Sequence, residues 1–361
     1  MTRPPILDIR DLTVEFRQGR RVPPLRAVDG VSLSIAAGET LGLVGESGSG
    51  KSTIGRAVLG LNPVHSGQIH FEGSDITRAR PRARRDLSAR LQVVFQDPYS
   101  SLNPARTIGQ TLAEPLLVHE QLDHRRTRTR IGEMLERVGM PADTADRYPG
   151  QFSGGQRQRI AIARALMLKP SLVICDEPVS ALDLSIQAQV MNLLAELQRE
   201  LALSYLFIAH DLPVVRHLSH RIVVLYRGQV MEVGPAKSVY ADPVHPYTHA
   251  LLAAVPEPDP RAQRARRTAR GATPATRPPA VGGCVFAHRC PHAIDTCHRD
   301  RPQLLPLTNR GGDATASQRL VTCHRSAELD LLTVTQQHQP HDDLPTAVGS
   351  TVKEAPCSAS E

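Results

Sequence analysis

The stretch GESGSGKST, residues 45–53, decides the fold that the rest of the chain must support. It fits the pattern G-x-x-x-x-G-K-[ST] and lies between an apolar run, ETLGLVG (39–45), and a segment with helical spacing, KSTIGRAVLGL (51–61). Glycines let the backbone wrap phosphate groups, so that N–H groups and the N-terminus of the helix face the negative charge. The strand before and the helix after disfavour a flexible glycine loop without a ligand. We therefore predict a phosphate-binding loop made of Gly45, Glu46, Ser47, Gly48, Ser49, Gly50, Lys51, Ser52 and Thr53.

The run LVICDEP (172–178) supplies the acidic partner of this loop. Its apolar residues predict a buried strand that ends at Asp176. We expect Lys51 to reach the β- and γ-phosphates, and Ser52 and Asp176 to hold Mg²⁺. Glu177 then lies beside the metal and is the natural general base for an attacking water.

A second phosphate-binding arrangement lies in QFSGGQRQRIAIARAL (151–166). Ser153, Gly154 and Gly155 precede a long amphipathic helix, so small residues, free N–H groups and a helix dipole come together. Alone, this would be an ordinary helix cap, but it stands just ahead of the acidic strand. Two such features in one chain imply either two nucleotides or one nucleotide shared between two subunits.

Strand-like and helix-like segments alternate over residues 6 to about 255, which predicts an α/β fold. The apolar runs SLVICDEP (171–178), SYLFIAH (204–210) and RIVVLYRG (221–228) read as strands of a parallel sheet that is buried on both faces. Between about 98 and 150 the pattern becomes mostly helical. Beyond 256 the chain is rich in Pro, Arg and Gly and reads as a linker.

We expect a cytosolic protein. The 361 residues carry a net charge of +7, and no apolar run approaches the roughly 18 residues of a membrane span. The start of the chain has no pattern of a secretory signal peptide. The basic balance could indicate nucleic acid, anionic lipid or phosphate ligands, or only solvated arginines. A cytosolic protein keeps its cysteines reduced, which disfavours disulfides.

Order and spacing of these motifs over residues 6–255 resemble the nucleotide-binding subunit of an ABC transporter. FSGGQ (152–156) resembles the family signature, with Phe152 where leucine is commoner. Gln96 matches the Q-loop glutamine, which senses Mg²⁺, and Asp183 matches the D-loop residue at the subunit contact. His210 matches the switch histidine at the γ-phosphate, and Phe16 stands where the family stacks an aromatic ring on adenine. By this resemblance the signature residues that face the partner's ATP are Phe152, Ser153, Gly154, Gly155 and Gln156.

The resemblance implies a P-loop NTPase fold with a RecA-like core and a helical subdomain. Two such domains clamp ATP and Mg²⁺ between them, with Ser52, Gln96 and Asp176 around the metal and Glu177, His210 and Gln96 in hydrolysis. It further implies a second ABC ATPase subunit, the same chain or a related one, and two transmembrane permease subunits. The chain would then lie peripherally on the cytoplasmic face of the cell (inner) membrane.

The segments VVFQDPYSSLNPARTIG (93–109) and DPVHPYTHALLAAVPEPDP (242–260) resemble the oligopeptide/dipeptide and nickel importer subgroup. That implies an extracytoplasmic substrate-binding protein and import of di- or oligopeptides, with nickel or another solute as the alternative. A soluble ABC ATPase of DNA repair, translation or iron–sulfur assembly is the rival class. We expect no nucleic-acid partner, because the chain has neither a coiled-coil insertion nor a second ATPase cassette. An exporter ATPase is disfavoured by the C-terminal extension.

Four of the six cysteines lie in the C-terminal extension with the spacing C-x5-C-x6-C-x25-C. Structural zinc usually uses tighter pairs, whereas four separate thiolates can enclose a [4Fe–4S] cluster. The subgroup resemblance adds weight to the cluster, and zinc stays open because four histidines lie nearby: His288, His292, His298 and His324. Absence of any metal also stays open. The proposed cluster ligands are Cys284, Cys290, Cys297 and Cys323.

The organisation that we predict has three parts. An ABC ATPase domain spans 6–255, with the helical subdomain at about 98–165. A C-terminal extension of the oligopeptide-importer type, with the cysteine cluster, spans 256–330, and a disordered tail spans 331–361. We expect Cys175 to be a core residue, while Cys357 lies in the tail.

Overall fold

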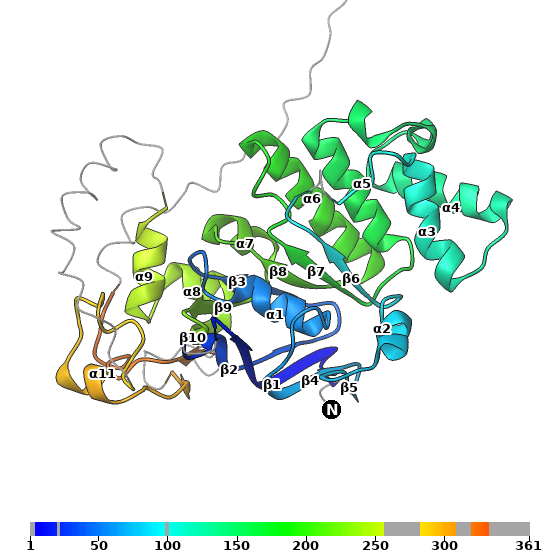
Figure 1. Ribbon diagram of the computed structural model, residues 1–361. Coiled ribbons are helices and arrows are strands. Elements are labelled where there is room, and N and C mark those ends of the chain that lie inside the picture. The colour runs from blue at the N-terminus through cyan, green and yellow to red at the C-terminus, as the bar shows by residue number, and fades with distance from the viewer. Residues whose placement is uncertain (1–3, 20–21, 98–100, 256–281, 308–318, 332–361) are drawn as a thin grey trace, which may run out of the picture.

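The computed structural model describes residues 4–19, 22–97, 101–255, 282–307 and 319–331 (Figure 1). The predicted linker lies almost wholly outside these ranges, and so do Cys357 and all but the first residue of the predicted tail. The expectation of an α/β fold is confirmed, with two sheets in the described part of the chain. None of the helices described is long and apolar enough to cross a membrane.

The larger sheet has eight strands in the order β11-β12-β10-β9-β3-β8-β7-β6. Its central strands β9, β3, β8, β7 and β6 run parallel, and β10, β12 and β11 add to one edge in antiparallel fashion. The strands are β3 (Thr40–Val44), β6 (Leu91–Val94), β7 (Leu172–Asp176), β8 (Ser204–Ile208), β9 (Arg221–Tyr226), β10 (Gln229–Pro235), β11 (Leu305–Pro306) and β12 (Leu320–Val321).

The second sheet is antiparallel, in the order β2-β1-β4-β5, and was not predicted. It consists of β1 (Leu7–Phe16), β2 (Leu25–Ile35), β4 (Ser66–Phe71) and β5 (Ser74–Asp75). Strand β1 lacks a clean alternation of buried and exposed residues because its register shifts between Ile9 and Leu12, where Asp11 has φ 48°. That irregularity hides the strand from pattern reading.

Helices lie around the larger sheet and beyond its edges (Figure 1). They are α1 (Lys51–Val58), α2 (Pro81–Leu87), α3 (Ile108–His119), α4 (His124–Arg137), α5 (Gly154–Leu166), α6 (Leu184–Leu201), α7 (Leu212–Leu218), α8 (Ala236–Ala241), α9 (Pro246–Ala253) and α11 (Asp295–Arg299), with short 3₁₀ turns at Ala142–Asp146 and Pro149–Gln151. The region predicted as a helical subdomain contains α3, α4 and α5. Its division from the rest of the chain stays a prediction.

Each central strand feeds two hydrophobic cores, because successive side chains point to opposite faces of the sheet. On β7, Val173 and Cys175 belong to the core that includes α3, α5 and α6. Leu172 and Ile174 belong to the core that includes α1 and the antiparallel sheet. Burial on both faces explains the continuous apolar runs that marked these strands in the sequence.

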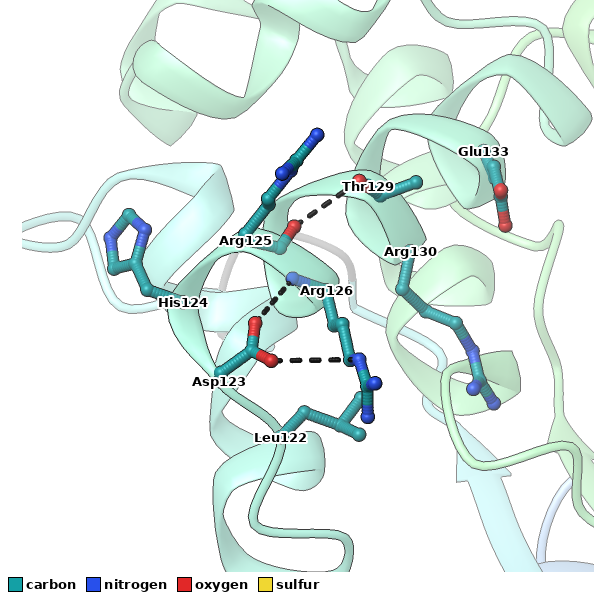
Figure 2. A pocket seen from close by; sticks show the side chains of 8 residues that line it. All are labelled: Leu122, Asp123, His124, Arg125, Arg126, Thr129, Arg130 and Glu133. Carbon is teal, nitrogen blue, oxygen red and sulfur yellow. Dashed lines mark hydrogen bonds and ion pairs between the residues drawn. The ribbon is translucent and has the colours of Figure 1, made fainter.

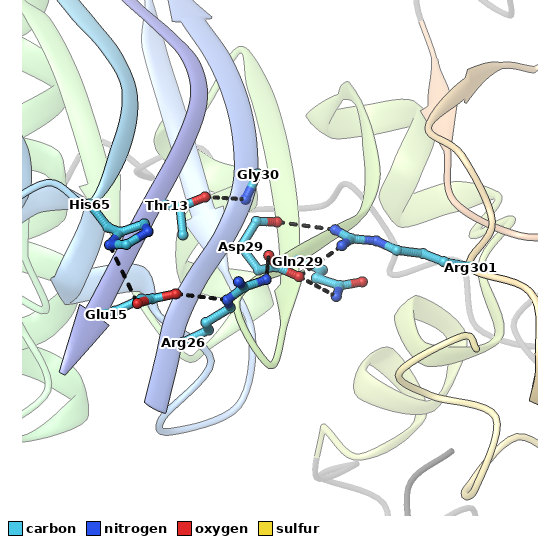
Figure 3. A network of polar contacts seen from close by, with 8 residues as sticks. All are labelled: Thr13, Glu15, Arg26, Asp29, Gly30, His65, Gln229 and Arg301. Carbon is cyan, nitrogen blue, oxygen red and sulfur yellow. Dashed lines mark hydrogen bonds and ion pairs between the residues drawn. The ribbon is translucent and has the colours of Figure 1, made fainter. Parts of the chain in front are cut away.

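The C-terminal extension is more closely joined to the ATPase domain than its Pro-rich composition suggested. Strand β12 pairs with β10, and Phe286 belongs to the core that includes α3, α5 and α6. Arg319 also crosses to β10, where its Nη2 lies 2.7 Å from Glu232 Oε1, with both side chains almost fully buried. Figure 3 shows another link, in which Arg301 reaches Asp29 on β2. The described extension therefore packs as part of the same body.

Candidate active site

The phosphate loop lies at the carboxyl end of β3, where the chain turns into α1. Its backbone conformation depends on glycine at Gly45 and Gly50, with φ 152° and 103°. A Cβ at Gly45 would lie 2.1 Å from the Leu225 carbonyl oxygen, and one at Gly50 would lie 2.4 Å from that of Ala27. The backbone of β9 and that of β2 thus lie directly against the loop, and only glycine fits at both positions.

Lys51 is buried at the start of α1. Its Nζ donates to the carbonyl oxygens of Gly45 and Glu46 at 2.8 and 2.9 Å. Burial lowers the pKa of Lys51, and the carboxylates of Glu177, Asp176 and Glu46 oppose that shift. The ammonium group is therefore held inside the loop that it closes, where it can meet a phosphate.

Ser52 and Asp176 come together although 124 residues separate them. The Ser52 hydroxyl donates to Asp176 Oδ1 at 2.6 Å, and Asp176 is nearly buried at the end of β7. Strands β3 and β7 flank β8 in the sheet, so their carboxyl ends lie on the same edge. A hydroxyl and a carboxylate at this spacing form a suitable oxygen ligand pair for Mg²⁺.

Two of the predicted residues, Gln96 and His210, lie against the side chain of Glu177. Its Oε2 accepts from Gln96 Nε2 at 3.2 Å and lies 3.2 Å from His210 Nδ1. Gln96 follows β6 and His210 follows β8, the two neighbours of β7. Glu177 itself has φ 49°, an unusual backbone conformation for a residue with a side chain, and such strain clusters at functional positions.

A cavity of about 50 Å³ opens beside this cluster and is lined by Glu177, Ser180 and His210 among others. That volume is room for a water molecule next to the Glu177 carboxylate. The arrangement can therefore hold a nucleophilic water, a carboxylate to accept its proton, and two side chains that orient the carboxylate.

The signature segment is held by local contacts. Ser153 caps α5, its hydroxyl accepting from the Gln156 N–H, and the Gln156 side chain accepts from the Ser153 N–H in return. Phe152 is buried beneath the Arg147 guanidinium, 4.5 Å from the ring centroid. Within the described part of the chain, none of the hydrogen bonds of Ser153 or Gln156 joins the phosphate loop.

Two other exposed positions, Phe16 and Asp183, belong to the predicted site. Phe16 ends β1 with 37% of its surface exposed, so its ring is open to a ligand. Asp183 caps α6 and is also exposed. Next to it, Leu184 is 82% exposed, an unusual state for a leucine and one that sequence reading did not single out.

A further hollow lies at the start of α4 (Figure 2). Asp123 caps this helix by accepting from the Arg126 N–H at 2.8 Å, and Arg130 pairs with Glu120 at 3.4 Å. No residue of the predicted nucleotide site lines this hollow, so the hollow and the phosphate loop are different places.

Two family models and several known proteins match this chain. The family model for ABC transporters matches residues 28–180, and the model for the oligopeptide/dipeptide transporter C-terminal region matches residues 231–297. A protein of Brucella ovis, named as a peptide import ATP-binding protein, is 50% identical over 304 residues, which cover 84% of this chain and 95% of the relative. The chain belongs to the ATP-binding subunits of ABC transporters. It is therefore the ATPase of such a transporter.

A further relative and two solved structures also resemble this ABC ATPase. A Sinorhizobium fredii protein, named as a peptide ABC transporter ATP-binding protein, is 48% identical over 84% of the chain and 83% of its own length. A solved ATP-binding cassette, described as a dimeric post-hydrolysis state bound to ADP and Pi, has a TM-score of 0.58 at 28% identity. It covers 64% of this chain and 98% of its own. The cbiO1 structure from Clostridium perfringens, part of an ABC transporter complex, has a TM-score of 0.59 at 29% identity, over 66% of this chain and 91% of its own.

The four extension cysteines line one small pocket together with His245, His292 and His324. All four are free thiols, and Cys297 is the most buried of them. Burial raises the pKa of Cys290 to about 12 and that of Cys323 to about 11, with added repulsion from the neighbouring thiol groups. Among the described residues, however, no group of three or more Cys, His, Asp or Glu side chains is arranged so that it could hold a metal ion. The four thiols therefore lie around one pocket, but they are not placed as the ligands of a metal ion would be.

Cys175 is fully buried in the core, as expected.

Proposed function

We propose that this ABC ATPase powers the import of di- or oligopeptides through an ATP-sandwich dimer. The observation that carries the catalytic part is the convergence of Gln96 and His210 on Glu177, beside the Ser52–Asp176 pair. The peptide cargo is supported by the names of the relatives and by the match to the oligopeptide/dipeptide transporter C-terminal region. Nickel or another solute is the alternative cargo.

Nucleotide binding is assigned to the phosphate loop and its partners. Loop N–H groups and Lys51 would hold the β- and γ-phosphates, and Phe16 would stack on adenine. Ser52, Asp176 and Gln96 would surround Mg²⁺, whose chemistry is to neutralise the charge that develops on the phosphates. In the structure the Ser52 hydroxyl bonds directly to Asp176, which supports their shared role.

Hydrolysis is assigned to Glu177 as the base that accepts the proton of the attacking water. Gln96 and His210 position the Glu177 carboxylate, and His210 would also contact the γ-phosphate. These three side chains come from the carboxyl ends of the neighbouring strands β6, β7 and β8.

The signature segment is assigned to the ATP of a second ABC subunit. Gly155 packs against Ile186 so closely that a Cβ there would lie 2.4 Å from the Ile186 Cγ2, so the start of α5 lies directly against the start of α6. The signature thus lies close to the D-loop residue Asp183, which stands at the start of α6. Exposed Leu184 next to Asp183 supports a subunit contact at this place.

Two permease subunits and an extracytoplasmic substrate-binding protein complete the proposed importer. The chain would then sit peripherally on the cytoplasmic side of the cell membrane. We propose no nucleic-acid partner. The predicted division into an ATPase domain at 6–255, a helical subdomain at about 98–165 and an extension from 256 is kept as part of this proposal.

We further propose that Cys284, Cys290, Cys297 and Cys323 bind a [4Fe–4S] cluster, with zinc as the alternative. Four free thiols around one pocket form a donor set that suits either metal centre. Because they lack ligand geometry in the structure, metal binding requires the thiols to move onto the metal. Such a centre would be a structural staple, tying the 284–297 loop to the segment after β12.

Metal content tests this assignment. Protein purified without oxygen should be coloured and contain about four iron atoms per chain. Cys290→Ser should lose the metal, whereas Cys357→Ser should keep it. Stoichiometric zinc in a colourless protein would select the alternative, and metal-free wild-type protein would reject both.

Transport itself is tested in the organism that carries the gene. Deletion of the gene should abolish uptake of labelled di- and oligopeptides, and the wild-type gene should restore it, whereas Glu177→Gln should not. Loss of nickel uptake with normal peptide uptake would reassign the cargo. Co-purification with DNA or ribosomes and not with membrane proteins would refute the importer class.

A further inference from the structure

Arg289, in the cysteine-containing extension, reaches the phosphate loop. Its Nη1 lies 2.9 Å from Glu46 Oε2, across 243 residues of sequence. The same nitrogen lies 3.5 Å from the Tyr226 hydroxyl at the end of β9. The extension is thus in direct contact with a residue of the nucleotide site.

A second contact holds the main chain of the same loop residue. The Glu46 N–H donates to the Tyr247 hydroxyl at 2.9 Å. Tyr247 packs in an aromatic cluster, with its ring centroid 4.6 Å from that of Tyr226 and 5.3 Å from that of Phe286. Phe286 stands three residues before Arg289, so the same part of the extension pairs with Glu46 and packs against Tyr247.

Charge gives the Arg289 contact a specific consequence. Glu46 carries the one carboxylate within the 45–53 loop, whose ligand is itself anionic. An unpaired Glu46 would repel the phosphates and would attract the Lys51 ammonium, which already bonds to the Glu46 carbonyl at 2.9 Å. Paired with Arg289, Glu46 contributes no net charge to the loop.

We propose that Arg289 is a positioning residue for nucleotide binding, which neutralises Glu46 and, together with Tyr247, fixes the phosphate loop. The extension then sets the affinity of the ATPase for nucleotide in addition to any metal that it binds. This inference rests on the proposed function, because it requires that residues 45–53 bind Mg-ATP.

The test measures the affinity of the full-length protein for a fluorescent ATP analogue with Mg²⁺. Arg289→Ala should weaken binding about two- to fivefold, since the pair is partly exposed. The turnover rate at saturating ATP should stay unchanged. The defect should shrink at high salt, because exposed charges are screened. Arg289→Lys should retain most of the affinity.

Two further variants separate charge from folding. Adding Glu46→Gln to Arg289→Ala should restore affinity, because it removes the uncompensated carboxylate. Arg301→Ala is the matched control: it breaks another ion pair between the extension and the ATPase domain, 2.8 Å from Arg301 Nη1 to Asp29 Oδ2 (Figure 3), but touches no loop residue. Its affinity should equal that of the wild type.

The inference is overturned if Arg289→Ala binds nucleotide as tightly as Arg301→Ala does. It is also overturned if the double variant binds no better than Arg289→Ala, because the effect would then be structural. Wild-type protein that binds no Mg-ATP would instead refute the proposed function, and the inference with it.

Discussion

Replacement of Glu177 by glutamine tests the centre of the proposed mechanism. The Glu177 carboxylate lies 3.2 Å from both Gln96 Nε2 and His210 Nδ1, at the end of β7. Glutamine has the same shape and can still accept one of these hydrogen bonds, but it cannot take a proton from water. The change therefore removes the base and leaves the local packing in place.

A general base contributes about 10²- to 10⁴-fold to a rate. The corresponding rise of the activation barrier is about 2.7 to 5.5 kcal/mol. Nucleotide affinity should be retained or rise slightly, because Lys51 keeps its own contacts to Gly45 and Glu46 and loses one competing negative charge. We thus expect turnover to fall by at least a hundredfold with no loss of Mg-ATP binding.

The assay is phosphate release at saturating Mg-ATP, paired with equilibrium binding of a fluorescent ATP analogue. Glu133→Gln, an exposed change on α4, is the matched control and should behave as wild type. Turnover of the Glu177→Gln variant within threefold of the wild-type rate would show that another group takes the proton. Loss of nucleotide binding would instead show that Glu177 contributes to nucleotide affinity.

Three further outcomes follow from other parts of the structure. Ser52→Ala should abolish the gain in ATP affinity that Mg²⁺ gives, measured with and without EDTA, and an unchanged gain would exclude Ser52 from the metal site. Phe16→Ala should weaken ATP binding about two- to tenfold, the value of one aromatic stacking contact, without lowering the melting temperature, since the ring is partly exposed. Arg319→Ala should lower the free energy of unfolding by about 3–5 kcal/mol in urea denaturation, because it leaves the buried Glu232 carboxylate unpaired. Arg325→Ala, which breaks a more exposed pair, should cost less than about 1 kcal/mol, and equal losses would refute the burial argument.

Several features of this ATPase could be predicted because neighbouring residues in the chain determine them. The glycines, Lys51 and Ser52 act within one turn between strand and helix, and their spacing alone indicates phosphate binding. Asp176 could be placed with Ser52 because parallel strands end on the same edge of a sheet. The signature cap at Ser153 is likewise local, since it involves residues three apart.

Other features depend on which strands become neighbours, and a single sequence does not encode that order in any local pattern. Because β6, β7 and β8 lie side by side, Gln96 and His210 meet at Glu177. The composition of the extension predicted an accessory segment, yet its β12 pairs with β10 of the main sheet.

The contact between Arg289 and Glu46 likewise depends on how the extension packs against the rest of the chain, with Phe286 in the core beside Tyr247. Long-range ion pairs of this kind leave no periodicity in the sequence, because each partner is only one charged residue among many exposed ones. The sequence by itself determined the chemistry of the phosphate loop, through local spacing. Only the tertiary structure decided that the C-terminal extension touches it.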